Sequence, residues 1–326
     1  MKMEPLSRDE VGLAFEPIAP DLERIEKIMI EVSAGATSFL TEFTTYLTKA
    51  GGKRLRPALT VLAAHLGKGH NPDVDVTAAA IEMTHLATLY HDDVIDEADL
   101  RRGVPSANQK WGNKVAILAG DYLFARASKI SAEVGGEVPA VLADAIAQVV
   151  QGQIMELESA YDPRRTEDKY LRTIHGKTAS LLEACTGLGS SLGGCDTAVN
   201  GAMKKFGIAF GYAFQVADDL LDLAATEEEL GKLPGTDLRD GVYTLPVIFA
   251  AQAEPALIEK LGTPSVDVDW IREATVDCGA FNRARSAAEG YVEQALGLLE
   301  LTPAGEARST LQALTRLVVD RVPVLS

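Results

Sequence analysis

The stretch that decides the fold is His91-Asp92-Asp93-Val94-Ile95-Asp96, which is followed by Arg101-Arg102-Gly103. Asp92 and Asp96 are four residues apart, and this spacing returns in Asp218-Asp219-Leu220-Leu221-Asp222. On a helix the spacing puts both carboxylates on one face, about 6 Å apart along the axis. Because like charges at this spacing destabilise a bare helix, the pattern predicts a cation between them.

Two such clusters, each flanked by apolar residues, predict a cage of hard oxygen ligands. One cluster alone in an acidic chain would more often be a solvated surface, but the repetition favours a metal site. Mg²⁺ suits the cage, because it takes one or two carboxylates and completes its shell with water and substrate phosphates.

The rest of the chain has helical periodicity almost everywhere, and little two-residue alternation suggests strands. Beyond helical patterns at Leu22–Met29 and Phe39–Leu47, we expect helices over 54–67, 75–98, 113–133, 138–160, 167–174, 177–193, 197–226, 242–252, 281–300 and 306–321. Turn residues interrupt the pattern only locally, and the glycines at 187–194 favour tight helix packing. The sequence therefore predicts an all-α protein with an N-terminal arm (1–19) and one helical bundle (20–326) around a central apolar cavity.

Composition and net charge argue against several classes of protein. The chain has 326 residues, of which 47% are hydrophobic and 24% charged, as in a globular protein. Its net charge of −16 argues against nucleic acid as a partner. No apolar run approaches the roughly 18 residues of a membrane span, and the N-terminus lacks the apolar core of a signal peptide. The three cysteines have no metal-ligand spacing, so we expect a reduced, cytoplasmic protein.

Basic residues also occur in groups that suit phosphates. Gly51-Gly52-Lys53-Arg54-Leu55-Arg56-Pro57 places three cations before a predicted helix, where glycines permit close approach of an anion. An ordinary charged loop is the alternative. Arg101 and Arg102 follow Asp96 closely enough to meet metal-held phosphates, although neutralisation of the carboxylates explains either one alone. Four weaker candidates are His85, Lys177, Gln215 and Lys232, each of which singly would be structural or a surface residue.

Together these motifs carry a family resemblance. Gly-Gly-Lys-Arg-Leu-Arg-Pro, His-Asp-Asp-x-x-Asp-x-x-x-x-Arg-Arg-Gly, Gly-Lys-Thr at 176–178, Phe-Gln-x-x-Asp-Asp-x-x-Asp at 214–222 and the segment from Gly231 to Gly241 occur in this order. From about residue 20 to 320 the chain closely resembles the trans-isoprenyl (polyprenyl) diphosphate synthases, and we assign it to their medium- to long-chain type. The resemblance implies the all-helical isoprenoid synthase fold and a homodimer, with a peripheral membrane contact for product release.

The resemblance also implies a role for each matched residue. Asp92, Asp96 and Asp218 would ligate about three substrate-bridged Mg²⁺ ions, supported by Asp93, Asp219 and Asp222. Arg101, Lys177 and Lys232 would hold the allylic diphosphate. Isopentenyl diphosphate would be bound by Lys53, Arg56, His85 and Arg102, with Gly52 allowing its approach, and the reacting carbons would be lined by Thr178 and Gln215. One position departs from the family, because many members have a lysine where this chain has Val242.

The chemistry implied is Mg²⁺-dependent prenyl transfer from an allylic diphosphate to isopentenyl diphosphate, and it needs no side-chain nucleophile. Several alternatives stay open: a short-chain farnesyl or geranylgeranyl diphosphate synthase, a non-catalytic partner subunit, a helical metal phosphohydrolase and a terpene cyclase. The subunit would have lost motif residues, the hydrolase would not need the second cluster, and the cyclase would lack the glycine–lysine cluster.

Product length is predicted from two small residues. Ala87 and Thr88 precede Asp92 by five and four residues, or about 6–7.5 Å back along the helix. In the resembling family a bulky aromatic at this point is the floor that stops growth. Small side chains here predict a hexaprenyl to decaprenyl product, unless Ala87 merely allows tight packing and another helix blocks the tail. Tyr90 lies about 160° around the helix from Asp92 and should point away.

Overall fold

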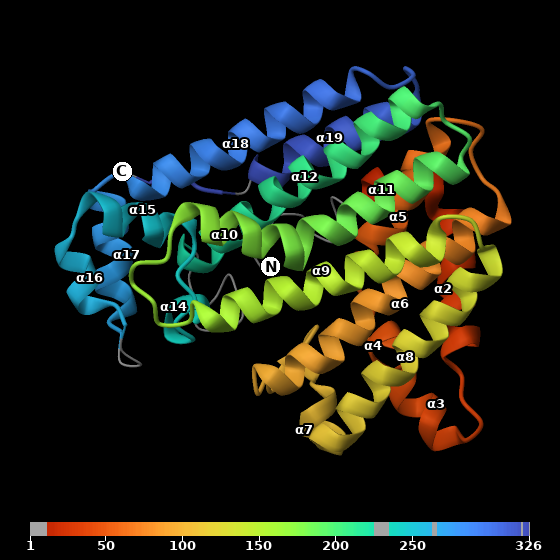
Figure 1. The fold of residues 1–326 in the computed structure, drawn as a ribbon, viewed down its shortest axis with the longest axis horizontal. Helices are drawn as coiled ribbons and strands as arrows, with labels where there is room; N and C mark the ends of the chain where they lie inside the picture. Colours follow the sequence, from red (N-terminus) through yellow and green to blue (C-terminus); the bar gives the residue numbers. More distant parts are fainter. Residues whose placement is uncertain (1–11, 225–234, 263–265, 321, 326) are drawn as a thin grey trace.

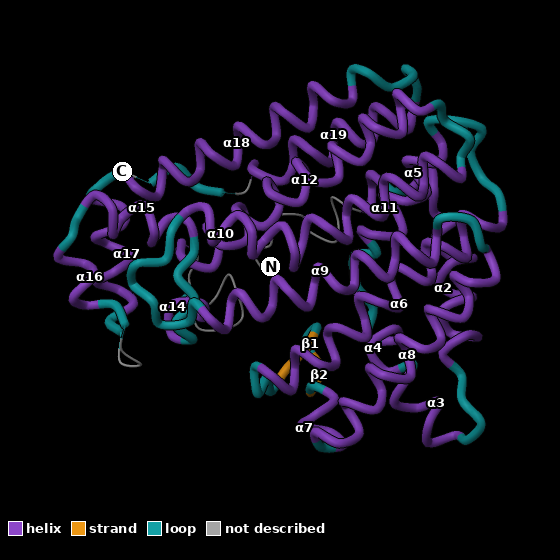
Figure 2. Tube along the Cα trace, viewed as in Figure 1, coloured by secondary structure: helices purple, strands orange, loops and turns teal. Residues whose placement is uncertain are grey.

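The computed structural model describes residues 12–224, 235–262, 266–320 and 322–325, and within them it is almost entirely helical (Figures 1 and 2). The first half contains η1 (Glu16–Ile18), α2 (Ala19–Ser33), α3 (Ser38–Thr44), α4 (Tyr46–Lys49), α5 (Leu55–His65), α6 (Pro72–Ile95), α7 (Ala107–Trp111), α8 (Asn113–Val134) and α9 (Val138–Glu158). The second half contains α10 (Glu167–Ile174), the π-helix η2 (His175–Ala179), α11 (Ser180–Leu192), α12 (Thr197–Ala224), α14 (Thr236–Arg239), α15 (Leu245–Ala253), α16 (Ala256–Lys260), α17 (Val268–Asp277), α18 (Ala280–Leu299) and α19 (Glu306–Asp320).

The prediction of an all-α bundle is confirmed. The helix that carries the first aspartate cluster, α6, begins where the sequence supplies a strong start signal. Asn71 caps it by accepting hydrogen bonds from the backbone N–H groups of Asp73 and Val74, and Pro72 occupies the first helical turn. The last half of the proposed N-terminal arm is helical, and Phe15 and Ile18 are buried in the core. The division into an arm and one domain stays a prediction.

The long helices pack lengthwise around α12 and α6 (Figure 1). Helix α12 lies against α11 and α18, while α6 lies against α5 and α8. Close helix contact requires glycine at a few points: a Cβ on Gly189 of α11 would lie 2.2 Å from Thr60 O of α5. The prediction that the glycines at 187–194 serve packing is therefore correct for this residue.

One described helix, α9, is long and apolar enough to cross a membrane by length and composition alone, and 22% of its most apolar window is buried. It packs against α8, α10 and α11 as part of the bundle. A single helix of this kind is weak support for a membrane span.

The described part of the chain also contains two very short strands. β1 (Leu100–Arg101) and β2 (Val104–Pro105) form an antiparallel hairpin after α6, with Arg101 opposite Val104 (Figure 2). The turn residues Arg102 and Gly103 have φ values of 55° and 81°. Two left-handed residues in a two-residue loop match the strand twist, so this turn fixes where the two arginines point.

Candidate functional site

The first aspartate cluster ends helix α6. Asp96 N donates to Asp92 O at 2.8 Å, so helical geometry holds through this turn and puts both carboxylates on one face, as predicted. Asp92 is half-buried, Asp96 is exposed, and Asp93 is fully buried on another face. Burial raises the pKa of Asp92 to about 6, and Asp96 and Asp93 add to the shift although Lys177 and Arg101 oppose it. A cation at this point would relieve the repulsion between the gathered negative charges.

The second aspartate cluster lies near the end of α12, and its residues differ in exposure and in hydrogen bonding. Asp218 is exposed and Asp222 follows one turn later, with its Oδ2 accepting a hydrogen bond from Asp237 N at 3.3 Å. Asp219 is buried, and both of its oxygens accept hydrogen bonds, from the Tyr170 hydroxyl at 2.5 Å and from Gln215 Nε2 at 2.9 Å. Asp219 therefore positions α12 against α10 rather than presenting a free oxygen.

Gln215 and Thr178 belong to the same chain of contacts. The Thr178 hydroxyl donates to Gln215 Oε1 at 2.7 Å, and Gln215 in turn donates to Asp219. Because the amide oxygen is held by Thr178, the amide nitrogen is directed at the carboxylate. The structure thus brings together three residues that the sequence named separately.

The hairpin at 100–105 sends its two arginines to different places. Arg101 Nε donates to Asp93 Oδ1 at 2.6 Å, and this carboxylate is buried. Arg102 Nη1 donates to Leu47 O at 2.9 Å and also to Gly51 O. Burial lowers the pKa of Arg102 to about 10, so it stays charged at neutral pH. The tight turn therefore places one arginine beside the aspartates and the other beside the glycine loop.

The glycine loop has the unusual backbone that its sequence suggested. Gly51, Gly52 and Arg54 have φ values of 84°, 156° and 52°. A Cβ on Gly52 would lie 2.9 Å from Arg102 Cζ. The sequence interpretation gave Gly52 the task of admitting substrate, whereas the group that lies against it in the structure is the guanidinium of Arg102.

Arg56 and His85 lie next to this loop, on α5 and α6. In the described part of the chain, no group accepts a hydrogen bond from the buried Arg56 Nε. Burial and the positive charges of Arg56, Arg102, Arg101 and Arg54 hold the pKa of His85 well below its usual range. A neutral His85 among arginines adds a hydrogen-bonding group without a further charge. Lys53 lies in the loop itself and is half-buried.

Lys177 lies in the π-helix η2, where one extra residue per turn changes the direction of the side chains. Its Nζ lies 2.5 Å from Glu156 Oε1 of α9. The two helices touch through glycines, since a Cβ on Gly176 would lie 2.9 Å from Gly152 Cα. The charge of Lys177 also reaches Asp92 and Asp96, because it lowers the pKa of each.

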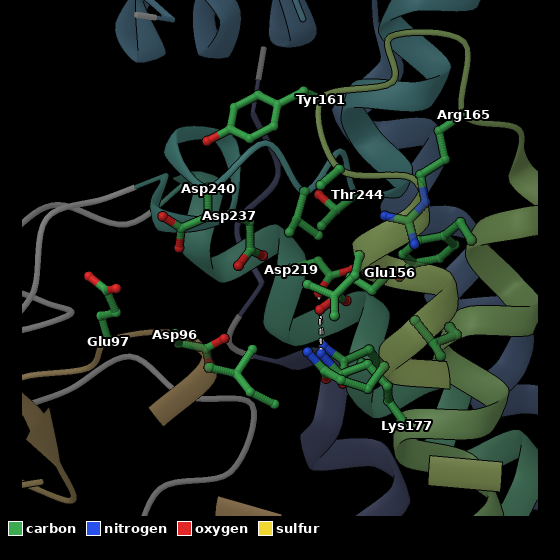
Figure 3. Close-up of a pocket in the computed structure, with 18 residues that line it drawn as sticks. Asp96, Glu97, Glu156, Tyr161, Arg165, Lys177, Asp219, Asp237, Asp240 and Thr244 are labelled. Atoms are coloured by element: carbon green, nitrogen blue, oxygen red, sulfur yellow. Dashed lines mark hydrogen bonds and ion pairs between the residues drawn. The ribbon is translucent and has the colours of Figure 1, made fainter. Parts of the chain in front are cut away.

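A pocket of about 460 Å³ joins these elements (Figure 3). Asp96 contributes to its wall from α6, Asp219 and Gln215 from α12, and Lys177 from η2. Figure 3 shows a dashed line that joins Glu156 and Lys177, with Asp237 and Asp240 to their left in the view. One aspartate from each cluster, Asp96 and Asp219, therefore lines this pocket. Asp92, Asp218 and Asp222 are not among its lining residues, so the convergence of the proposed metal ligands on one cavity stays a prediction.

Several pocket residues were not assigned a role from the sequence: Glu97, Glu156, Tyr161, Arg165, Tyr170, Asp237, Asp240 and Thr244. Asp237 and Asp240 lie in the motif from Gly231 to Gly241, but no local sequence pattern marks the other residues as functional. Val242 also lines the pocket and adds no charge. Lys232 lies outside the described residues, so its predicted role stays a prediction.

The donor atoms suit Mg²⁺, because the clusters offer only carboxylate oxygens and the buried Asp93 Oδ2 has no partner among the described residues. Of the described side chains, one group of three has ligand atoms within 4.8 Å of one another, and it lies elsewhere: Asp21, His70 and Asp75. Arg24 already bridges both of those carboxylates, at 2.5 and 2.8 Å. The clusters at the pocket would therefore meet through ions and phosphate oxygens rather than through a closed protein shell.

The residues named for product length lie on α6. Ala87 is fully buried, and Thr88 is half-buried with its hydroxyl donating to His85 O at 2.8 Å. The Tyr90 hydroxyl donates to Phe43 O and accepts from Leu47 N at 3.3 Å. Tyr90 thus points toward α3 and α4, which agrees with the prediction that it points away from Asp92.

Comparisons with known proteins agree with this geometry. The sequence profile of the polyprenyl synthetase family matches residues 37–276. The nonaprenyl diphosphate synthase of Mycobacterium tuberculosis (strain ATCC 25618 / H37Rv) is 42% identical over 308 residues, which cover 91% of each chain. A decaprenyl diphosphate synthase structure from Rhodobacter capsulatus has a TM-score of 0.90 and 36% identity over 98% of this chain and 100% of its own. A polyprenyl synthase structure from Caulobacter crescentus CB15, complexed with calcium and isoprenyl diphosphate, has a TM-score of 0.90 and 33% identity with the same coverage.

Proposed function

The chain belongs to the polyprenyl synthetase family and is a prenyltransferase; on that premise we propose that it condenses isopentenyl diphosphate with an allylic diphosphate into a long all-trans polyprenyl diphosphate. The observation that supports the proposal is the pocket that is lined by Asp96 from one cluster, Asp219 from the other, and the cation Lys177. A phosphohydrolase would have no use for the second cluster.

Asp92, Asp96 and Asp218 are the proposed Mg²⁺ ligands, and about three ions would bridge them to substrate. The bound Mg²⁺ would neutralise charge that develops on the departing diphosphate. The protein itself contributes fixed cations at the same place: Lys177 can exchange Glu156 for a phosphate, and Arg101 stands beside Asp93. Cations already in position stabilise the transition state without reorganisation.

The second substrate, isopentenyl diphosphate, is assigned to the glycine loop. Arg56, Lys53 and the neutral His85 are its proposed ligands, with Arg102 close by. The buried, apolar face of α6 excludes water from the reactive carbocation, and Thr178 and Gln215 border the reacting carbons. Loss of a proton, which we assign to the released diphosphate, completes the step.

A long product is supported by the small side chains of Ala87 and Thr88, and relatives named as nonaprenyl and decaprenyl diphosphate synthases agree with it. The test is incubation with Mg²⁺, labelled isopentenyl diphosphate and farnesyl or geranylgeranyl diphosphate, followed by sizing of the product. We expect a longer all-trans chain whose formation EDTA stops. Inorganic phosphate and a free alcohol as the only products would favour the hydrolase instead.

A homodimer is the proposed assembly, and the outward face of the α8–α9 hairpin supports it. Four large apolar residues are exposed on α8 and α9, between 44% and 61%: Ile117, Leu118, Val150 and Ile154. Large apolar side chains exposed on two neighbouring helices are typical of a protein interface. Light scattering should give twice the chain mass, and Ile154→Asp should shift it toward the monomer.

The proposed location is the cytoplasm, with a peripheral membrane contact for release of the hydrophobic product. The three cysteines, Cys185, Cys195 and Cys278, are free thiols in the structure, which suits a reducing compartment. Fractionation of cells that express the protein, with and without a salt wash of the membranes, tests both parts.

A further inference from the structure

Glu82 is a buried carboxylate on α6 to which neither the motifs nor the prenyl-transfer chemistry assigns a task. It lies one turn before His85, and only 2% of it is exposed. A buried charge needs partners, because its desolvation is costly. Its Oε1 lies 3.5 Å from Arg54 Nη1 and 3.9 Å from Arg102 Nη2. Glu82 therefore stands between two guanidinium groups that come from different segments.

Each of these arginines also holds backbone on the far side of the glycine loop. Arg54 Nη2 donates to Thr48 O at 2.7 Å, and Arg102 Nη1 donates to Leu47 O at 2.9 Å and to Gly51 O. Through them, Glu82 connects α6 to α4 and to the loop that follows it. Arg54 has a left-handed backbone with φ 52°, which is unfavourable for a residue other than glycine. Its contacts on both sides of the loop hold it in this conformation.

The arginines around Glu82 thus divide into two kinds. Arg54 Nη2 and Arg102 Nη1 donate to backbone carbonyls inside the protein, although Arg54 Nε has no acceptor among the described residues. Arg56 Nε likewise has none, and no described group accepts a hydrogen bond from the rest of this guanidinium. Arg56 is near enough for the charge of Glu82 to raise its pKa against the effect of burial. One carboxylate among three guanidinium groups leaves a positive surplus beside Arg56, which suits a diphosphate.

We propose that Glu82 is a positioning residue for isopentenyl diphosphate: it clamps Arg54 and Arg102, and so holds the glycine loop and Arg56 in the arrangement that binds this substrate. The inference rests on the proposed function. It also reassigns Arg102 in part, since its contacts make it a member of the clamp as well as a neighbour of the diphosphate.

A role of Glu82 through its charge and a role through its position predict opposite changes in the affinity for isopentenyl diphosphate. If Glu82 acted only through its charge, its removal would make the cluster more positive and would tighten the binding of an anion. If it acts by position, its removal lets two guanidinium groups repel each other and releases the loop, so binding weakens. The sign of the change in affinity therefore separates the two roles.

The experiment compares Glu82→Gln, Glu82→Asp and the control Glu26→Gln. Glu26 Oε1 also lies 3.5 Å from Arg54, but its side chain is 42% exposed. We expect both Glu82 variants to raise the KM for isopentenyl diphosphate about tenfold or more, the effect of roughly one lost charged contact. The KM for the allylic substrate should stay within about twofold, and Glu26→Gln should match the wild type. Thermal unfolding establishes that each variant is folded.

Calorimetric binding of isopentenyl diphosphate to the same variants, without turnover, gives a second readout. An unchanged or lower KM in Glu82→Gln would overturn the clamp, and so would a Glu82→Asp variant that behaves as the wild type, because aspartate keeps the charge but shortens the reach. A wild-type protein that neither binds nor incorporates isopentenyl diphosphate would overturn the proposed function and this inference with it.

Discussion

Lys177 Nζ lies 2.5 Å from Glu156 Oε1, so the lysine that we expect to hold a diphosphate forms an ion pair with a carboxylate of the protein. Both side chains are partly buried, at 31% and 19% exposure. With Lys177 as the proposed diphosphate ligand, the ion pair would open when substrate binds and close again when diphosphate leaves. Glu156 would then compete with the diphosphate for this cation.

Replacement of Glu156 by glutamine should strengthen the binding of inorganic diphosphate. Lys177 would no longer have to leave a carboxylate, and the pocket would lose one negative charge, so we expect the inhibition constant to fall by about three- to tenfold. Product release should slow accordingly. Inhibition assays measure the effect, and Glu158→Gln, an exposed position on the same helix, is the control. Weaker inhibition would contradict the competition.

Loss of a proposed metal ligand should affect the rate more than binding. Asp92→Ala or Asp218→Ala removes a proposed metal ligand that stabilises charge in the transition state, so kcat should fall by on the order of 10²–10³. Steady-state kinetics at saturating Mg²⁺ measure this, with Asp73→Ala at the other end of α6 as the control. Unchanged kinetics in Asp92→Ala would remove the basis of the site.

The metal-free protein should lose stability as the pH rises through the titration of Asp92. Its pKa is about 6 in the folded state, against 3.8 for an unperturbed aspartate, so between these values the folded state binds more protons than the unfolded one. The contribution of Asp92 to stability is therefore greatest below the lower value and declines until about pH 6. In EDTA at pH 7, Asp92→Asn should raise the stability by on the order of 1 kcal/mol.

The same variant should lose the stabilisation that Mg²⁺ and diphosphate give together. Thermal unfolding from pH 4 to pH 8, with and without these ligands, measures both effects. A variant that is less stable than the wild type in EDTA at pH 7 would show that Asp92 has compensating partners within the protein.

The glycine loop should govern the affinity for isopentenyl diphosphate. Lys53→Ala or Arg56→Ala removes ground-state binding, so the KM for this substrate should rise about tenfold or more while kcat changes little. The matched control is Lys49→Ala, an exposed lysine on the preceding α4. An equal effect on the allylic substrate would mean that the loop does not distinguish the two diphosphates.

A bulky side chain at position 87 should shorten the product. Ala87→Phe places an aromatic ring where the allylic tail is expected to pass, so growth should stop after fewer additions while the first condensation proceeds. Chromatographic sizing gives the length, and Thr88→Val, which keeps the size but removes the hydroxyl, is the control. A wild-type product of geranylgeranyl length that Ala87→Phe leaves unchanged would show that another helix forms the floor.

The sequence predicted most of the long helices and named both cluster residues that line the pocket, Asp96 and Asp219, whereas the other predicted aspartates are not among the lining residues. Helical periodicity is a local property, so the helix predicted over 197–226 begins at the residue where α12 (Thr197–Ala224) begins, and its last two predicted residues lie outside the described part of the chain. The hairpin at 100–105 was missed, because two-residue strands are too short to show alternation. Residues 177–179 were assigned to one helix with α11, but the structure places them in the π-helix η2.

The partners of the site residues were harder to foresee. Tyr170 lies 49 positions from Asp219, and Glu156 lies 21 from Lys177. Such pairs follow from how whole helices pack, which no spacing within one helix contains. Gly52 shows the same limit: its freedom of backbone was predicted, but the group it admits, the guanidinium of Arg102, comes from a distant hairpin.

The two-residue turn at Arg102-Gly103 has a consequence for which sequence changes the protein tolerates. Arg101 donates to Asp93 and the adjacent Arg102 donates to Leu47 O, so the length of this turn sets where both side chains point. We expect insertion or deletion of a single residue to turn the second arginine away from Leu47 and Gly51 and so to release the glycine loop from the hairpin. Substitutions nearby should be tolerated better than insertions or deletions, because they keep the length of the hairpin that separates the two proposed diphosphate sites.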